Sequence, residues 1–258
     1  MAYQNILVDR DGSTAVVTLN RPERRNPLSL EMLEELTAAF RAIGEDTAAR
    51  VAVLRANGPA FSAGHDIGEM VGKADAFYRR LFEACTVLME TLQDIPQPVI
   101  ARVHGLATAA GCQLAASCDI VVAAQEARFA TPGVRIGLFC STPMVALSRA
   151  VPAKRAMEML LTGDAISAQE ALSAGLASRV VPAAELDETV RGLAAKIASS
   201  SPFVVALGKR AFYRQLAMPQ PLAYDYMQDV MSVNAAARDA QEGMMAFLGK
   251  RAPKWGGG

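Results

Sequence analysis

The stretch at residues 105–119 reads GLATAAGCQLAASCD. Small residues fill its first half, and it carries no carboxylate before Asp119. Apolar runs flank it at residues 99–103 and 120–123, and both are typical of buried strands. A turn of small residues that leads into a helix between two such strands predicts a βαβ unit. We therefore expect an α/β protein.

The preceding residues predict more strands and helices in alternation. Two β-rich runs, 6–9 and 15–19, flank an Asp-Gly turn and indicate a hairpin. Ser29 is placed to cap a helix whose apolar residues recur at helical spacing. A short buried strand is expected at residues 51–54 and a helix at residues 75–93.

From residue 183 onward the sequence predicts almost only helix, over residues 185–198, 202–216 and 224–248. We therefore divide the chain into an α/β core, residues 1–200, and a C-terminal helical region, residues 201–258. The helical region is rich in Met and aromatic residues that need a surface to pack against. Its last five residues are expected to form a frayed end.

Composition argues against several classes of protein. Lys+Arg and Asp+Glu are both 26, so a net charge of +0 gives no attraction to nucleic acid. No apolar run reaches the ~18 residues that span a bilayer, so no membrane span is expected. The two histidines and four cysteines lack metal-ligand spacing, so we expect no metal. The absence of a close CxxC pair among the four cysteines, and of a basic segment followed by an apolar run at the start of the sequence, favours a cytoplasmic protein.

A second turn of small residues occurs in FSAGHDI, residues 61–67. Backbone N–H groups where such a turn enters a helix have no partner within that helix, so they can bind an anion or a developing oxyanion. An ordinary tight loop is the plain alternative. Ser62 also lies in Ala60-x-Ser62-x-Gly64, which differs from a nucleophile-elbow pattern at one residue, Ala60 in place of Gly, and this opens a hydrolase hypothesis with His104 as the base.

Together with residues 20–29, 161–176 and 241–251, these two turns resemble the enoyl-CoA hydratase/isomerase (crotonase) family along nearly the whole chain. Residues 61–66, 105–119 and 139–142 are similar to one particular branch of it. The resemblance implies an α/β crotonase fold, a spiral of ββα units with a C-terminal helical trimerisation region. It also implies a homotrimer or homohexamer that takes acyl-CoA thioesters, with no cofactor beyond the coenzyme A of the substrate.

The resemblance further implies an oxyanion hole made by the backbone N–H groups of His65 and Ala110. Such fixed donors stabilise the charge that develops on a thioester oxygen, each by about 10²–10³ in rate. By the same resemblance, or as basic groups near the site, the residues expected to contact coenzyme A are Arg24, Arg25, Ser62, Ala63, His65, Asp66, Ile67 and Lys250.

The sequence departs from the hydratase pattern at two positions. Where hydratases of the family carry the two glutamates that hold and activate water, this chain has Gln113 and Gly133. Glutamine can orient a water but cannot take its proton, and glycine can do neither. Because each acid–base group contributes roughly 10²–10⁴ in rate, we expect hydration itself to be weak.

Two other functions stay open. One is decarboxylation of a malonyl-type CoA, or other enolate chemistry, because the methylmalonyl-CoA decarboxylase branch carries a similar Ser-Ala-Gly-His-Asp-Ile segment. The other is acyl-CoA binding without catalysis. The ring of His65 could serve as an acid or base if it turns inward, or it could only shape the rim of the pocket.

Overall fold

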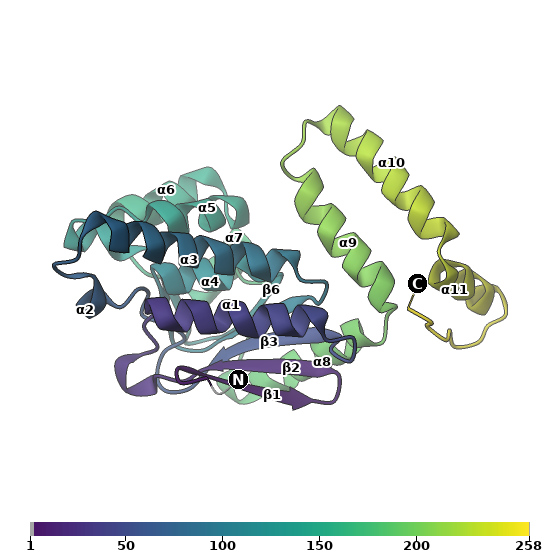
Figure 1. Cartoon of the computed structure of the whole chain (residues 1–258), viewed down its shortest axis with the longest axis horizontal. Helices are drawn as coiled ribbons and strands as arrows, with labels where there is room; N and C mark the ends of the chain where they lie inside the picture. Colours follow the sequence, from purple (N-terminus) through teal and green to yellow (C-terminus); the bar gives the residue numbers. More distant parts are fainter. Residues whose placement is uncertain (1–2, 258) are drawn as a thin grey trace.

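A six-stranded sheet forms the main strand layer of the molecule (Figure 1). The structure is a computed structural model that describes residues 3–257. The strands lie in the order β1-β2-β3-β4-β6-β9; β1 pairs with β2 antiparallel and every other pair is parallel. Their bounds are β1 Ile6–Asp11, β2 Thr14–Leu19, β3 Val51–Ala56, β4 Val99–Val103, β6 Ile120–Ala124 and β9 Arg179–Val181. The predicted hairpin and the parallel β4 to β6 connection are confirmed.

A second sheet has three strands, which lie in the order β5-β7-β8. Its strands are β5 Leu106–Thr108, β7 Arg128–Ala130 and β8 Ile166–Ser167, with β5 parallel to β7 and β7 antiparallel to β8. The sequence analysis did not predict these strands, because two or three residues are too few to show an apolar period. They are defined by their partners instead.

Helices cover the strands and continue beyond them. Ser29 caps α1 by accepting a hydrogen bond from the Met32 amide, as predicted, and Ser167 with Glu170 forms a capping box on α7. The helices of the core are α1 Leu30–Glu45, α2 Ile67–Met70, α3 Asp75–Asp94, α4 Ala110–Ser117, α5 Ser141–Ala150, α6 Ala153–Thr162, α7 Ala168–Ala174 and α8 Leu186–Ala198. Three short 3₁₀ turns lie at Pro22–Arg24, Pro132–Ile136 and Ala183–Glu185.

The two faces of the six-stranded sheet bury different sets of side chains, because successive residues of a strand point to opposite faces. On one face, Leu54 and Ala101 belong to the large core that α1 and α3 complete. On the other face, Val53 and Ile100 pack with Leu186 and further residues of α8. The helices α1, α3 and α4 therefore lie together on one side of the sheet, and this side holds both turns of small residues.

Three helices, α9 Pro202–Gln215, α10 Gln220–Ala236 and α11 Arg238–Leu248, stand apart from the strand layers (Figure 1). A buried ion pair ties α9 to the core: Lys209 Nζ lies 2.8 Å from Asp119 Oδ2 and donates to the carbonyls of Leu92 and Gln97. Tyr213, one turn along α9, donates to the other Asp119 oxygen at 2.9 Å.

The expectation of a frayed C-terminal end is wrong for residues 254–257. Trp255 Nε1 donates to the Ser199 carbonyl at 2.8 Å, and the Gly256 and Gly257 amides donate to the buried carboxylate of Asp239. Gly258 lies outside the described residues. Within residues 3–257 no single helix has the length and apolarity to cross a membrane; Ala183–Ala198 and Pro202–Gln215 meet that test only as a pair, bent by 104°.

Candidate active site

Three loop segments lie side by side next to the N-terminus of α4. Ser62 pairs with Ala107 and His65 pairs with Leu28, both as parallel bridges, so the segment 61–66 lies between the other two. The Ser62 amide donates to the Leu106 carbonyl at 3.1 Å, and the Leu28 amide donates to the Gly64 carbonyl at 2.7 Å. The two turns of small residues, residues 61–67 and 105–119, are far apart in the sequence and together form one site.

Asn26 and Ser62 hold this arrangement from inside. The Asn26 side chain is fully buried and donates to the carbonyls of Asn57 and Ala60. Ser62 Oγ donates to the Asn26 carbonyl at 2.8 Å and is itself fully buried. His104, the base of the hydrolase hypothesis, bonds instead to the Gly58 carbonyl and to Arg102. The structure does not form a nucleophile elbow, and Ser62 is a structural residue.

The backbone N–H groups of His65 and Ala110 both lie where the two turns meet. The bridge to Leu28 uses the Gly64 carbonyl and the Asp66 amide, so the N–H of His65 faces away from Leu28. Ala110 is the first residue of α4, where an amide has no partner within the helix. Neither N–H donates to any of residues 3–257.

Close packing brings these two amides together. A Cβ placed on Gly64 would lie 2.9 Å from the Ala109 Cβ and 3.4 Å from the Ala110 nitrogen, and one on Gly111 would lie 2.6 Å from the Ser62 carbonyl oxygen. Both positions therefore require glycine. Ala109 holds φ at 50° and ψ at −119°, a positive-φ conformation outside the left-handed helical region that costs a residue with a Cβ about 1–3 kcal/mol. The strained residue lies directly before the amide of Ala110.

The positions of the two missing glutamates differ in their surroundings. Gln113 is buried on α4, and its Oε1 lies 3.7 Å from the Cys85 Sγ. Burial raises the pKa of the Cys85 thiol to about 12, so the thiol is the donor in this contact. A Cβ on Gly133 would lie 2.4 Å from the Leu138 carbonyl oxygen and 2.9 Å from the Cys140 Sγ. The backbone leaves no room for a side chain there.

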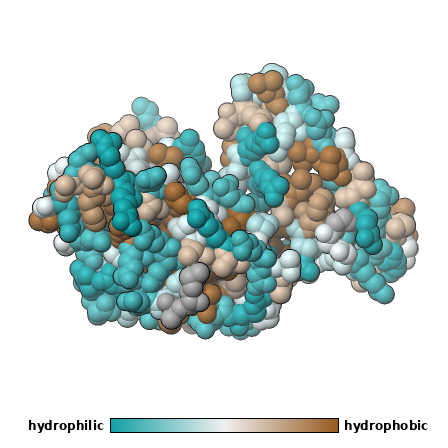
Figure 2. All heavy atoms as spheres, viewed as in Figure 1, coloured by the Kyte–Doolittle hydropathy of each residue, from teal (hydrophilic) through white to brown (hydrophobic). Residues whose placement is uncertain are grey.

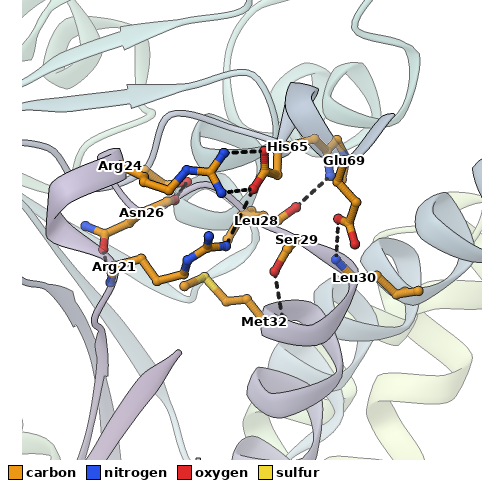
Figure 3. Close-up of polar contacts among 11 residues, drawn as sticks. Arg21, Arg24, Asn26, Leu28, Ser29, Leu30, Met32, His65 and Glu69 are labelled. Atoms are coloured by element: carbon orange, nitrogen blue, oxygen red, sulfur yellow. Dashed lines mark hydrogen bonds and ion pairs between the residues drawn. The ribbon is translucent and has the colours of Figure 1, made fainter. Parts of the chain in front are cut away.

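Of the predicted coenzyme A contacts, Arg24 and Asp66 pair with each other (Figure 3). The guanidinium of Arg24 contacts both oxygens of the buried Asp66 carboxylate at 2.8–2.9 Å. Together with Arg21 they line a cavity of about 520 Å³. Asp66 also precedes α2, which begins at Ile67 as the sequence predicts, and Ile67 is exposed.

The other predicted contacts separate into two groups. Ala63 and Arg25 adjoin the site, because the Ala63 amide donates to the Arg25 carbonyl at 2.9 Å. Lys250 follows α11, at the opposite end of the molecule from α2, so a single chain does not bring it to the site (Figure 1). Among residues 3–257 no three His, Cys, Asp or Glu side chains gather as a metal site requires.

The ring of His65 points into the protein. Its Nδ1 lies 3.3 Å from the Leu28 carbonyl oxygen (Figure 3). The ring meets Phe82 of α3 edge to face, with centroids 5.5 Å apart. Its Nε2 is buried without a hydrogen-bond partner among the described residues. Burial lowers the pKa of His65 below its ordinary 6.5, although the contact with the Leu28 carbonyl opposes that shift. The imidazole is therefore neutral near pH 7.

Sequence reasoning missed the part that α3 plays in this site. Phe82 contacts the His65 ring and Cys85 contacts Gln113, and the two residues are three positions apart on the helix. That spacing places them on one face of α3. The spacing of Phe82 and Cys85 is visible in the sequence, but only the tertiary structure shows that this face of α3 contacts the two turns.

The sequence pattern of the enoyl-CoA hydratase/isomerase family matches residues 9–258. The human enoyl-CoA hydratase domain-containing protein 3, mitochondrial, is 51% identical over 240 residues, which are 93% of this chain and 79% of that protein. Its crystal structure aligns with a TM-score of 0.96 at 48% identity, covering 98% of this chain and 100% of that one. An enoyl-CoA hydratase from Mycobacterium smegmatis gives the same TM-score at 47% identity, covering 98% and 99%.

Proposed function

Because the chain belongs to the enoyl-CoA hydratase/isomerase family, we propose that it is an acyl-CoA enzyme that stabilises a thioester enolate with the backbone N–H groups of His65 and Ala110. The single observation that carries this proposal is the contact between the two turns. Gly64 packs against Ala109 and the Ala110 nitrogen, and the amides of His65 and Ala110 have no acceptor among residues 3–257. Two fixed donors beside one another suit an oxygen that gains negative charge.

Hydration of an enoyl-CoA is expected to be slow in this enzyme. A hydratase of the usual kind needs two carboxylates, and this chain offers the amide of Gln113 and no side chain at Gly133. The oxyanion hole alone lowers the barrier to enolate formation without moving the proton of a water molecule. Chemistry that passes through an enolate and does not activate water fits these residues better.

Decarboxylation of a malonyl-type CoA is the second candidate. The specific observation in its favour is that neither Gln113 nor Gly133 carries a charge. A substrate carboxylate beside those positions meets no like charge, whereas two glutamates would repel it. Loss of carbon dioxide leaves the same enolate, held by the same two amides.

Arg24 and Asp66 support a role in binding the coenzyme A part of the substrate. The ion pair neutralises Asp66, and Arg24 keeps a side chain 48% exposed at the edge of the cavity that it shares with Arg21. An exposed guanidinium can still donate to a phosphate oxygen. Arg25 is an exposed cation next to it, whereas Lys250 would have to act from a neighbouring subunit.

The proposal also covers the oligomeric state, the cofactor requirement and the cellular location of the enzyme. We expect a homotrimer or homohexamer, no cofactor apart from the coenzyme A of the substrate, and a cytoplasmic protein. Four buried cysteines, none of them in a disulfide, suit a reducing compartment. Mass spectrometry of small molecules that co-purify with the protein would test for a cofactor other than coenzyme A. Fractionation of the host cell would test the cytoplasmic location.

Binding and turnover of a panel of acyl-CoA thioesters test the proposed function. Calorimetry is expected to give saturable binding of butyryl-CoA and crotonyl-CoA, and mass spectrometry is expected to show little hydration of crotonyl-CoA. The kcat/KM for hydration is expected to lie below the ~10⁴ M⁻¹s⁻¹ at which ordinary enzymes begin. Absence of saturable binding for every acyl-CoA in the panel would contradict the proposal.

A further inference from the structure

We propose that the side chain of His65 is the base that exchanges a proton with the α-carbon of the bound acyl group. This inference rests on the proposed function, because it requires the thioester oxygen to lie at the amides of His65 and Ala110. It assigns the acid–base step, which Gln113 and Gly133 cannot perform, to an imidazole rather than to a carboxylate.

The hydrogen bond to Leu28 fixes the tautomer of His65. The Leu28 carbonyl oxygen can only accept a hydrogen bond, so Nδ1 carries the proton at 3.3 Å from it. Nε2 therefore holds a lone pair and is an acceptor. A base needs this form, and the Leu28 carbonyl also stabilises the imidazolium that follows proton uptake.

The Nε2 acceptor is unsatisfied. It is buried and has no donor within residues 3–257. An unpaired buried acceptor costs about 1–3 kcal/mol, so such groups are rare in a core unless a ligand or a reaction uses them. The contact with Phe82 is apolar and does not relieve this cost.

Helix α3 relates the ring of His65 to Gln113. His65 contacts Phe82 and Gln113 contacts Cys85, and these two residues of α3 lie three positions apart on one helix face. Side chains at that spacing are about 5–6 Å apart. The His65 ring and the Gln113 side chain therefore pack against the same face of α3. Gln113 is one of the two positions where the resemblance places the acid–base groups of the family.

The reaction step balances without a further reactant. The α C–H bond of the acyl group breaks, its proton goes to Nε2, and its electron pair forms the enolate, whose oxygen accepts from the amides of His65 and Ala110. Return of a proton from Nε2 to the same carbon restores the thioester. In D₂O the imidazolium exchanges with the solvent, so the net change is replacement of α-hydrogen by deuterium.

Exchange of butyryl-CoA in D₂O tests this inference, because it needs neither a double bond nor a water nucleophile. The α-methylene signal in the proton spectrum and the mass of the product report the rate. The wild-type protein is expected to exchange these hydrogens above the rate in buffer. His65→Gln and His65→Asn keep the backbone N–H and are expected to lower the rate at least ~10²-fold, with butyryl-CoA binding changed less than about threefold.

The matched control is His104→Gln, because His104 is the other histidine and both of its ring nitrogens are already bonded within the fold. It is expected to exchange like the wild type. The wild-type rate is also expected to stay constant from pH 8 to 6.5 and to fall only at lower pH, since the pKa of His65 is lowered and the neutral ring is the active form. The His65→Gln protein is expected to lack this decline.

The outcomes separate the two proposals. Wild-type protein that binds no acyl-CoA contradicts the proposed function itself. Wild-type protein that binds butyryl-CoA without exchange, or a folded His65→Gln protein that exchanges at the wild-type rate, contradicts only the role of the His65 ring. Circular dichroism of each variant establishes that it is folded.

Discussion

At the scale of single residues, the two uncharged positions of the site differ in what they would tolerate. Gln113→Glu is expected to raise hydration of crotonyl-CoA by about 10- to 10²-fold, because a carboxylate can take a proton from water. Burial raises the pKa of a carboxyl group, so the gain should increase with pH as the added group ionises. The measurement is kcat/KM for crotonyl-CoA between pH 6 and 9. An unchanged rate over that range would contradict this prediction.

Gly133→Glu is not expected to add to that gain. Sequence alone suggested that glutamates at both positions would restore hydration, but a Cβ on Gly133 meets the Leu138 carbonyl oxygen at 2.4 Å. Overpacking of this kind costs about 1–3 kcal/mol, or several degrees in Tm for a chain of this length. Gly133→Ala is the matched control, because it adds the colliding atom without the charge.

At the scale of secondary-structure elements, the docking of α9 depends on Lys209. The Lys209 side chain is 6% exposed, and its ammonium contacts the carboxylate of Asp119, whose side chain is 14% exposed. Lys209→Met keeps the apolar stem and leaves Asp119 with only the Tyr213 hydroxyl and the Val99 amide. Removal of one partner from a buried pair typically costs 3–5 kcal/mol, so we expect a loss of about 3 kcal/mol in the free energy of unfolding, measured by urea denaturation.

Two further variants make that expectation specific. Lys196→Met removes an exposed lysine of α8 and is expected to change the free energy of unfolding by less than about 0.5 kcal/mol. The double variant Lys209→Met with Asp119→Asn should cost less than the sum of its single changes, because both remove the same contact. Additive costs would show that Lys209 stabilises α9 through its two carbonyl contacts alone.

At the scale of the whole molecule, the C-terminal helices expose an apolar surface that a single chain does not cover (Figure 2). Its exposed side chains include Phe212, Leu216, Leu222, Tyr224, Met231, Val233, Met245 and Phe247. Contiguous exposed apolar surface marks an interaction site. Because the resemblance to the family implies a homotrimer or homohexamer, we expect light scattering to give three or six times the mass of one chain at micromolar concentration.

Substitution of apolar residues on this surface by aspartate is expected to dissociate the assembly. Phe212→Asp with Met231→Asp buries two carboxylates in an apolar contact and should shift the mass toward that of one chain. Val8→Asp is the control, because Val8 is an exposed apolar residue of β1, outside the C-terminal helices. A wild-type protein with the mass of a single chain would contradict the expected oligomer.

Helices and strands with a clear short-range sequence pattern could be predicted from the sequence. The β1–β2 hairpin, the capped helix α1, the long helix α3 and the βαβ unit around α4 follow from periodicity and turn residues within a few positions of one another. The two turns of small residues, and the absence of glutamate at Gln113 and Gly133, were also visible in the sequence. Residues close to one another in the sequence are sufficient to set the backbone conformation of such elements.

Features that depend on contacts between residues far apart in the chain could be seen only in the tertiary structure. The strands β5, β7 and β8 are too short to have a period and exist because they pair with one another. The inward direction of the His65 ring depends on Leu28 and Phe82, and the exclusion of a side chain at Gly133 depends on Leu138. These features are set by packing across the folded chain, and no local pattern in the sequence encodes which distant atoms will meet.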